Sequence, residues 1–111
     1  MTRSKYFSRK VVVDGIKFDS KRESEYYLKL KELEKEGKIK DLELQKEFVL
    51  QDKFKIGNKT RREITYRADF CYVTTDDDKL HTVDVKGFRT EVYRLKKKLF
   101  EYKYGVELEE V

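Results

Sequence analysis

The chain has 111 residues, a length typical of one domain with a modest core. Its single cysteine and single histidine exclude an internal disulfide and a cysteine-based zinc site, and they disfavour a Ser-His-Asp triad. Lysine and arginine number 27 and acidic residues 22, a net charge of +5 that favours a polyanionic partner such as nucleic acid.

The N-terminal part of the chain divides into a tail and the start of a domain. Residues 1–10 are expected to be a flexible basic tail, and residues 11–111 to form a single domain. Residues 11–18 hold two short apolar runs around Asp14-Gly15, a dipeptide typical of a tight β-hairpin. The domain is therefore predicted to begin with a hairpin.

A helix is predicted next, over residues 19–37. Asp19 or Ser20 is placed to cap its start, and Gly37 to end it. The segment after this helix is predicted to be mainly β-structure. It comprises one bent or two short strands over 39–51, a basic loop or hairpin tip over 52–63, and strands over 64–73 and 80–87.

The second predicted helix covers residues 90–105, with Thr90 as its cap. Its buried side is predicted to be an apolar stripe at helical spacing, formed by Val92, Leu95, Leu99 and Tyr102. Residues 106–111 could add a strand at the edge of a sheet. The order β-β-α-β-β-β-β-α-β predicts an α/β fold with a central mixed sheet flanked by two helices.

The hairpin formed by the last two central strands brings two acids into register. If its turn is centred between Asp76 and Asp77, Asp69 lies directly opposite Asp84, with the Cβ atoms about 4.5–5.5 Å apart. Lys86 follows two residues after Asp84 and is therefore expected on the same face of the strand.

Facing carboxylates repel each other, so stability alone does not favour this arrangement. A divalent cation would relieve the repulsion, and oxygen ligands suit magnesium, manganese or calcium. A bound metal lowers the pKa of water and contacts a phosphate oxygen, and a nearby lysine can assist the attacking water. Asp69, Asp84 and Lys86 are therefore candidate catalytic residues for phosphodiester hydrolysis. The alternative is a solvated strand face with an ordinary ion pair.

Glu23 is a third candidate acid, on the first predicted helix. It shares the inward stripe of that helix with Tyr27 and Leu30, so its carboxylate is expected to face the interior. It also stands three residues after Ser20, which makes a capping box. Two interpretations stay open: Glu23 binds a metal or water, or it only caps the helix.

Four segments carry a family resemblance: FDSKRESEYY, YRADF, VDVKG and, after a threonine, YRLKKKLFEYKYG. Together they resemble the PD-(D/E)XK nuclease superfamily, and most of all a family of small phage-encoded members. Glu23 matches the superfamily's helix acid, Asp69 its first strand acid, and Asp84-Val85-Lys86 its acid-x-lysine motif. The resemblance covers nearly the whole chain from about residue 11.

The resemblance implies a restriction-endonuclease-like core in which Asp69, Asp84 and Glu23 hold magnesium, with manganese as a substitute. It also implies DNA cleavage in phage replication, recombination or packaging, with phage replication or recombination proteins as possible partners. The expected location is the cytoplasm, which is the host's if a phage encodes the protein. No uncharged apolar run approaches the roughly 18 residues of a membrane span, so no membrane partner is expected.

Basic residues in two places are candidates for DNA contacts. Lys59, Arg61 and Arg62 lie in the basic loop, and Arg94 and Lys97 share one side of the second helix. The alternative in each place is a solvated face with local ion pairs. Gln45 is an auxiliary candidate, because in similar nucleases a glutamine near the site helps to hold water or substrate. A hydrogen bond within a strand is the alternative.

Three functions remain open at this point. The first is a magnesium-dependent DNA endonuclease that is structure-selective or nicking, because so small a domain has little surface for reading base sequence. The second is a nuclease-like module that binds nucleic acid without cutting it. The third is a Holliday junction resolvase, which would need two active sites and hence a homodimer.

Overall fold

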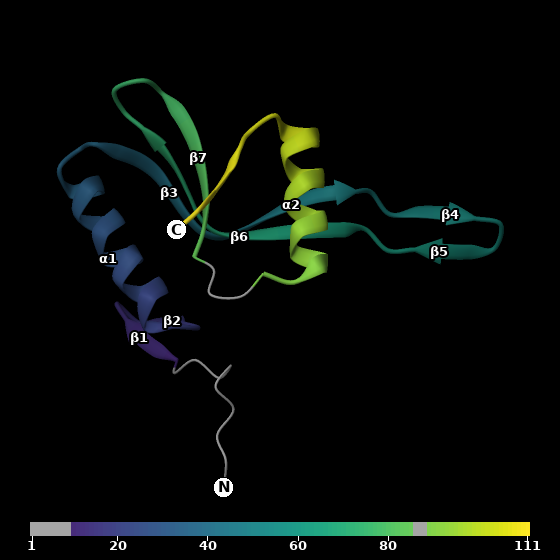
Figure 1. Ribbon diagram of the computed structural model, residues 1–111, viewed down its shortest axis with the longest axis horizontal. Coiled ribbons are helices and arrows are strands. Elements are labelled where there is room, and N and C mark those ends of the chain that lie inside the picture. Colours follow the sequence, from purple (N-terminus) through teal and green to yellow (C-terminus); the bar gives the residue numbers. More distant parts are fainter. Residues whose placement is uncertain (1–9, 86–88) are drawn as a thin grey trace, which may run out of the picture.

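In the computed structural model of the protein, which describes residues 10–85 and 89–111, a four-stranded mixed sheet forms the centre (Figure 1). Its strand order is β3-β6-β7-β8. The strands are β3 (Ile39–Gln51), β6 (Ile64–Thr74), β7 (Lys79–Asp84) and β8 (Leu108–Glu110). Strand β6 is antiparallel to both β3 and β7, and β8 runs parallel to β7. The predicted α/β class with a central mixed sheet is confirmed.

The chain enters the fold through a separate small hairpin of β1 (Val11–Val13) and β2 (Ile16–Phe18). Its turn residues Asp14 and Gly15 have φ values of 53° and 75°. Two consecutive left-handed residues define the tight turn that Asp-Gly favours. The predicted hairpin is confirmed.

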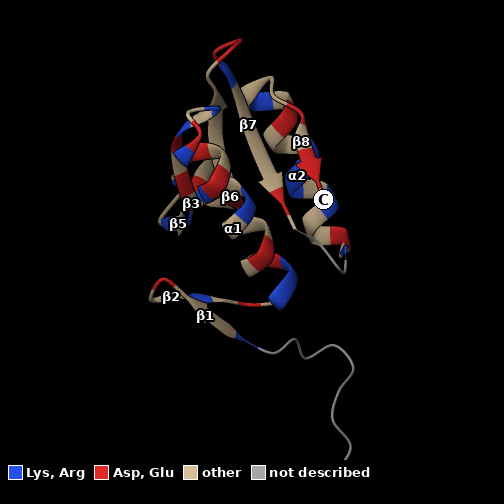
Figure 2. Ribbon diagram, turned by 90° about the vertical axis from the view of Figure 1, so that its left-hand side faces the viewer, with Lys and Arg blue, Asp and Glu red and all other residues tan. Residues whose placement is uncertain are grey.

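Helix α1 (Lys21–Lys35) covers one face of the sheet. Its N-cap is Ser20, whose side chain accepts a hydrogen bond from the backbone N–H of Glu23 at 3.1 Å. Tyr27 and Leu30 are buried against apolar side chains of the sheet and of the hairpin. Acidic and basic positions are interspersed along the helix, as its solvated side requires (Figure 2).

Between β3 and β6 the chain forms a further hairpin of β4 (Phe54–Ile56) and β5 (Lys59–Arg61), which we call the arm. The arm extends away from the body as a continuation of β3 and β6 (Figure 1). Every residue from 51 to 64 is exposed. Segment 39–51 is thus one strand and the basic segment is a hairpin, each of them one of the two predicted alternatives. The two strands of the arm give five strands between the helices, one more than in the predicted order.

Helix α2 (Glu91–Tyr104) packs on the other face of the sheet. Thr90 caps its start, where its side chain accepts a hydrogen bond from the N–H of Tyr93 at 3.0 Å, and Gly105 ends it with a φ of 65°. Neither helix in the described parts of the chain is long and apolar enough to span a membrane.

The predicted buried stripe of α2 is wrong. Val92, Leu95, Leu99 and Tyr102 are 62%, 59%, 38% and 89% exposed, whereas Tyr93 and Phe100 are buried. The helix carries two apolar sides, and the side with Tyr93 and Phe100 faces the sheet. Phe100 contacts Phe48 and Tyr66, with ring centroids 4.9 and 5.6 Å apart.

The two faces of the sheet form two cores, and β3 and β6 contribute to both. Leu44 and Phe70 pack in the α1 core, whereas Phe48 and Tyr66 pack in the α2 core. In a regular strand, residues four apart share a face. Both strands therefore change face in between, where Gln45 has a left-handed φ of 55°.

Candidate active site

The predicted register of β6 and β7 is confirmed. The strands pair from Thr74 opposite Lys79 to Phe70 opposite Val83. Beyond this point β6 continues beside β3, whereas β7 pairs with β8. We call this point of separation the fork. Asp69 and Asp84 are the next residues in the register, so the two predicted strand acids lie at the fork.

Asp69 connects the two branches of the fork. Its Oδ2 accepts a hydrogen bond from the backbone N–H of Val85 at 2.8 Å, and its Oδ1 accepts one from the side chain of Gln45 at 3.3 Å. The side chain is half-buried. Its two oxygens are therefore held by different strands, one by the end of β7 and one by β3.

Gln45 joins two of the predicted acids. Its Nε2 donates to Oε2 of Glu23 at 3.1 Å and to Oδ1 of Asp69 at 3.3 Å. Its left-handed backbone is unusual for a residue other than glycine, asparagine or aspartate, so the surrounding contacts must hold it. One residue thus brings together side chains from α1, β3 and β6.

Glu23 takes part in the helix cap and in the site through different atoms. Its backbone N–H donates to Ser20, whereas its carboxylate accepts from Gln45. Its side chain lies inward, as predicted, with 6% of the residue exposed. The Ser20 half of the predicted capping box is therefore present, and the Glu23 carboxylate contacts Gln45 in the site.

Asp84 is fully buried on the α2 side of the fork. Tyr66 donates a hydrogen bond from its hydroxyl to Oδ2 of Asp84. Burial, and then this hydrogen bond, raise the pKa of Tyr66 far above its usual range, so the hydroxyl stays a donor at any working pH. The sequence did not predict Tyr66 beside an acid, because strict alternation places it on the opposite face from Asp69.

A second acid, Glu110, lies next to Asp84 in the parallel register of β7 and β8. It accepts a hydrogen bond from the Tyr93 hydroxyl at 2.7 Å and forms ion pairs with Arg89 at 3.1 Å and Lys97 at 3.5 Å. The hydrogen bond from Tyr93 lowers the pKa of Glu110, and the two cations act in the same direction. This cluster anchors α2 to the sheet beside the fork.

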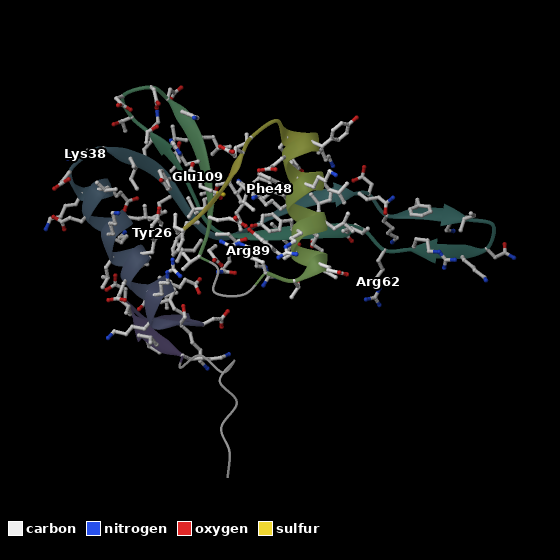
Figure 3. All side chains as sticks on the ribbon, in the orientation of Figure 1. Tyr26, Lys38, Phe48, Arg62, Arg89 and Glu109 are labelled. Atoms are coloured by element: carbon white, nitrogen blue, oxygen red, sulfur yellow. The ribbon has the colours of Figure 1, made fainter. Side chains whose placement is uncertain are left out.

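Of the predicted DNA-contacting residues, Lys97 contacts an acid beside the fork, and the others are exposed on and beside the arm or on α2. Lys59, Arg61 and Arg62 are exposed on and beside the arm, where the side chain of Arg62 extends into solvent (Figure 3). Arg94 is exposed on α2, whereas Lys97 is half-buried in its ion pair with Glu110. Lys86 lies outside the described residues, so its catalytic role stays a prediction.

The acids offer ligands of the right chemistry for a hard divalent cation, since all are carboxylates. Among the described residues, however, no group of three or more histidine, cysteine or acidic side chains is arranged to hold a metal ion. The amide of Gln45 donates to both Glu23 and Asp69. A cation shared by these two carboxylates would therefore have to displace that amide.

One comparison with known proteins gives a match. A family model described as "Protein of unknown function (DUF1064)" matches residues 3–110, nearly the whole chain. No curated protein and no solved structure matches the chain.

Proposed function

The chain belongs to the DUF1064 family, and for this member we propose a magnesium-dependent DNA endonuclease of the PD-(D/E)XK type. The observation that supports the proposal is the fork, where Gln45 links Glu23 of α1 to Asp69 of β6, and where Asp84 of β7 is the next residue in the register after the last pair. The proposed reaction is hydrolysis of a phosphodiester bond in nicked or branched DNA, with manganese able to replace magnesium. The proposed setting is phage DNA replication, recombination or packaging.

Energetic cost supports a functional reading of the fork. A carboxylate such as Asp84, fully buried, is costly unless it is held by hydrogen bonds or a cation. A left-handed glutamine costs about 1–2 kcal/mol relative to a regular strand residue. Apolar residues at these positions would stabilise the sheet better. The polar side chains are therefore better explained by a catalytic role than by a contribution to stability.

The chain's own residues would divide the work at the fork. Asp69, Asp84 and Glu23 would hold the cation, which when bound makes water a better nucleophile and stabilises charge on the phosphate. Tyr66 fixes the orientation of Asp84 through its hydroxyl. Gln45 fixes Glu23 and Asp69. Lys86 would assist the attacking water, and its place two residues after Asp84 in the sequence supports this role.

DNA contacts are proposed for exposed cations on the arm and on α2. Lys59, Arg61 and Arg62 on and beside the arm, and Arg94 on α2, are free to reach a phosphate backbone. Lys97 would first have to leave Glu110, since the two are paired. Arg94 is therefore the stronger candidate on this helix.

A nuclease-like module that binds DNA without cutting is the second candidate. One observation favours it: the described acids do not form a ready group of three metal ligands. In such a module Gln45 would be a permanent structural link between Glu23 and Asp69. Magnesium would then leave the hydrogen bonds of Gln45 unchanged.

The deciding experiment is cleavage of labelled linear, nicked, flap and four-way-junction DNA with magnesium, with manganese and with a chelator. Asp84→Asn and Asp69→Asn preserve side-chain volume and remove the charge at the fork. Asp76→Asn removes an exposed acid from the turn at the other end of the β6–β7 hairpin and is the matched control. Lys86→Ala tests the residue next to the fork in the sequence.

We expect metal-dependent cutting that falls about 100-fold or more in the two fork variants and in Lys86→Ala. The control should cut like the wild type, and circular dichroism should show all four variants folded. Folded wild-type protein that cuts none of these DNAs with either metal would refute the enzyme and leave the binding module.

A further inference from the structure

Apolar side chains gather on the solvent side of α2. Val92, Leu95, Leu99 and Tyr102, which we call the outer stripe, are all exposed, and Tyr102 is 89% exposed. The opposite side of the helix already packs on the sheet through Tyr93 and Phe100. A contiguous exposed apolar stripe of this kind on a 13.5 kDa protein marks a protein interface.

The spacing of the outer stripe indicates a helix as its partner. Its members follow one another at intervals of three, four and three residues. This is the a/d spacing with which two helices insert side chains into each other's gaps. A sheet or a phosphate backbone has no matching period, and a polyanion gains little from aliphatic contacts.

The intervals between the residues of the outer stripe are the same in either direction along α2. An antiparallel copy of α2 would therefore place Val92 against Tyr102 of the second copy, and Leu95 against Leu99. We propose that the outer stripe binds the outer stripe of a second copy of this chain, with the two α2 helices antiparallel about a two-fold axis at the level of residue 97. Each contact then occurs twice, as a symmetric interface requires.

Side-chain volume distinguishes the antiparallel from the parallel arrangement. Antiparallel pairing sets the largest member, Tyr102, against the smallest, Val92, so every layer of the interface has a similar volume. Parallel pairing would stack Tyr102 on Tyr102 and Val92 on Val92, leaving one overfilled and one underfilled layer. Even filling and opposed helix dipoles both favour the antiparallel pair.

Charged residues flanking the stripe do not decide the pairing. By helical position, Glu91 and Lys98 lie on one flank, and Lys96 and Lys103 on the other. In an antiparallel pair each flank faces its own copy. With the axis at residue 97, Lys98 lies closest to Lys98 of the second copy, and Lys96 lies between Lys96 and Lys103 of the second copy. Both flanks therefore oppose the pairing weakly, and apolar burial has to drive the association.

The interface is small for a stable dimer. A helix of 14 residues is about 21 Å long, whereas specific complexes bury about 800 Å² on each partner. The dimer is therefore expected to be weak, with a dissociation constant of the order of micromolar. It would form and separate readily at cellular concentrations.

Sedimentation velocity on the full-length protein without DNA tests the proposal, from about 1 µM to several hundred µM. Leu95→Lys puts a charge in the middle of the outer stripe. Leu28→Lys does the same to an exposed leucine of α1, 49% exposed, and is the matched control. We expect dimers for the wild type and the control, and at least about tenfold weaker association for Leu95→Lys. A monomer throughout, or equal association of both variants, would overturn the proposal.

Disulfide trapping tests the orientation. The native Cys71 is buried, so introduced cysteines report on the surface. A mixture of Val92→Cys and Tyr102→Cys proteins should form the mixed disulfide under mild oxidation, because the two positions face each other. Preferential disulfides between identical variants would overturn the antiparallel pairing. Neither test measures cleavage, so the proposed nuclease activity and this interface fail or succeed separately.

Discussion

The two helices are similar in length and both start with a hydroxyl cap, yet they use their apolar residues in opposite ways. Helix α1 buries Tyr27 and Leu30 on its predicted stripe, together with the acid Glu23. Helix α2 buries Tyr93 and Phe100 and leaves the outer stripe in solvent. The comparison teaches that periodicity identifies an apolar side but not the surface against which it packs.

The buried sides of the two helices also contribute different groups to the molecule. On α1 the buried side delivers a carboxylate to the fork, where Gln45 contacts it. On α2 the buried side delivers rings that fill the second core, while the exposed side remains available for another molecule. One helix therefore belongs to the proposed site and the other to the proposed interface.

Removing the buried ring of α2 should have the largest effect on stability. Phe100 has no exposed surface, and Phe100→Ala should lower the free energy of unfolding by about 3–5 kcal/mol. Leu95→Ala on the outer stripe should change it by less than about 0.5 kcal/mol. Guanidinium denaturation at low micromolar protein measures both. Similar costs for the two variants would mean that the aliphatic side also packs in the monomer.

A pair of leucines on α1, one buried and one exposed, should show the same contrast in the free energy of unfolding. Leu30 is 1% exposed, so Leu30→Ala should cost about 2–5 kcal/mol. Leu28→Ala should stay within about 0.5 kcal/mol. The same denaturation experiment reads both values, and a costly Leu28→Ala would show that α1 has a second packed side.

The effect of the α1 cap on stability can be measured separately from the effect of the Glu23 carboxylate on cleavage. Ser20→Ala should lower the free energy of unfolding by about 1 kcal/mol, because the N–H of Glu23 loses its acceptor, and should leave cleavage unchanged. Glu23→Gln keeps that N–H and should abolish cleavage, if the proposed function is right. Thermal unfolding and the DNA assay measure the two effects. Equal loss of cleavage in both variants would show that Glu23 acts only through helix stability.

The smallest expected effect is the acid titration of Glu110. Its pKa is lowered in the folded protein, so the stability that it adds is present above its unfolded pKa of about 4.3 and is lost as the pH falls through the folded value. Tyr93→Phe removes the main cause and should bring the pKa of Glu110 back toward its ordinary range. Carboxyl chemical shifts followed against pH test this, and an unchanged midpoint would assign the shift to Arg89 and Lys97.

Local patterns predicted what local geometry determines. The Asp14-Gly15 hairpin, both helix caps and the register of β6 with β7 follow from turns and caps within a few residues of each element. The position of Asp69 and Asp84 at the fork follows from that register. These features could be derived because each depends on neighbouring residues rather than on distant packing.

Distant packing explains what the sequence could not predict. The bridge from Gln45 to Glu23 and Asp69 depends on a left-handed backbone that glutamine does not signal. Tyr66 meets Asp84 only because its strand changes face. The choice between two apolar sides of α2 depends on the shape of the sheet beneath it. In each case the deciding contact comes from a residue far away in the chain.

The change of face at Gln45 makes both cores depend on the same two strands. Because β3 and β6 each pass from one core to the other, neither core has a set of strands to itself. A gene fragment encoding only the hairpin, α1 and the first part of β3 would leave Leu42 and Leu44 without the strand that covers them. Neither core can therefore form on its own, because each one needs strands that also serve the other.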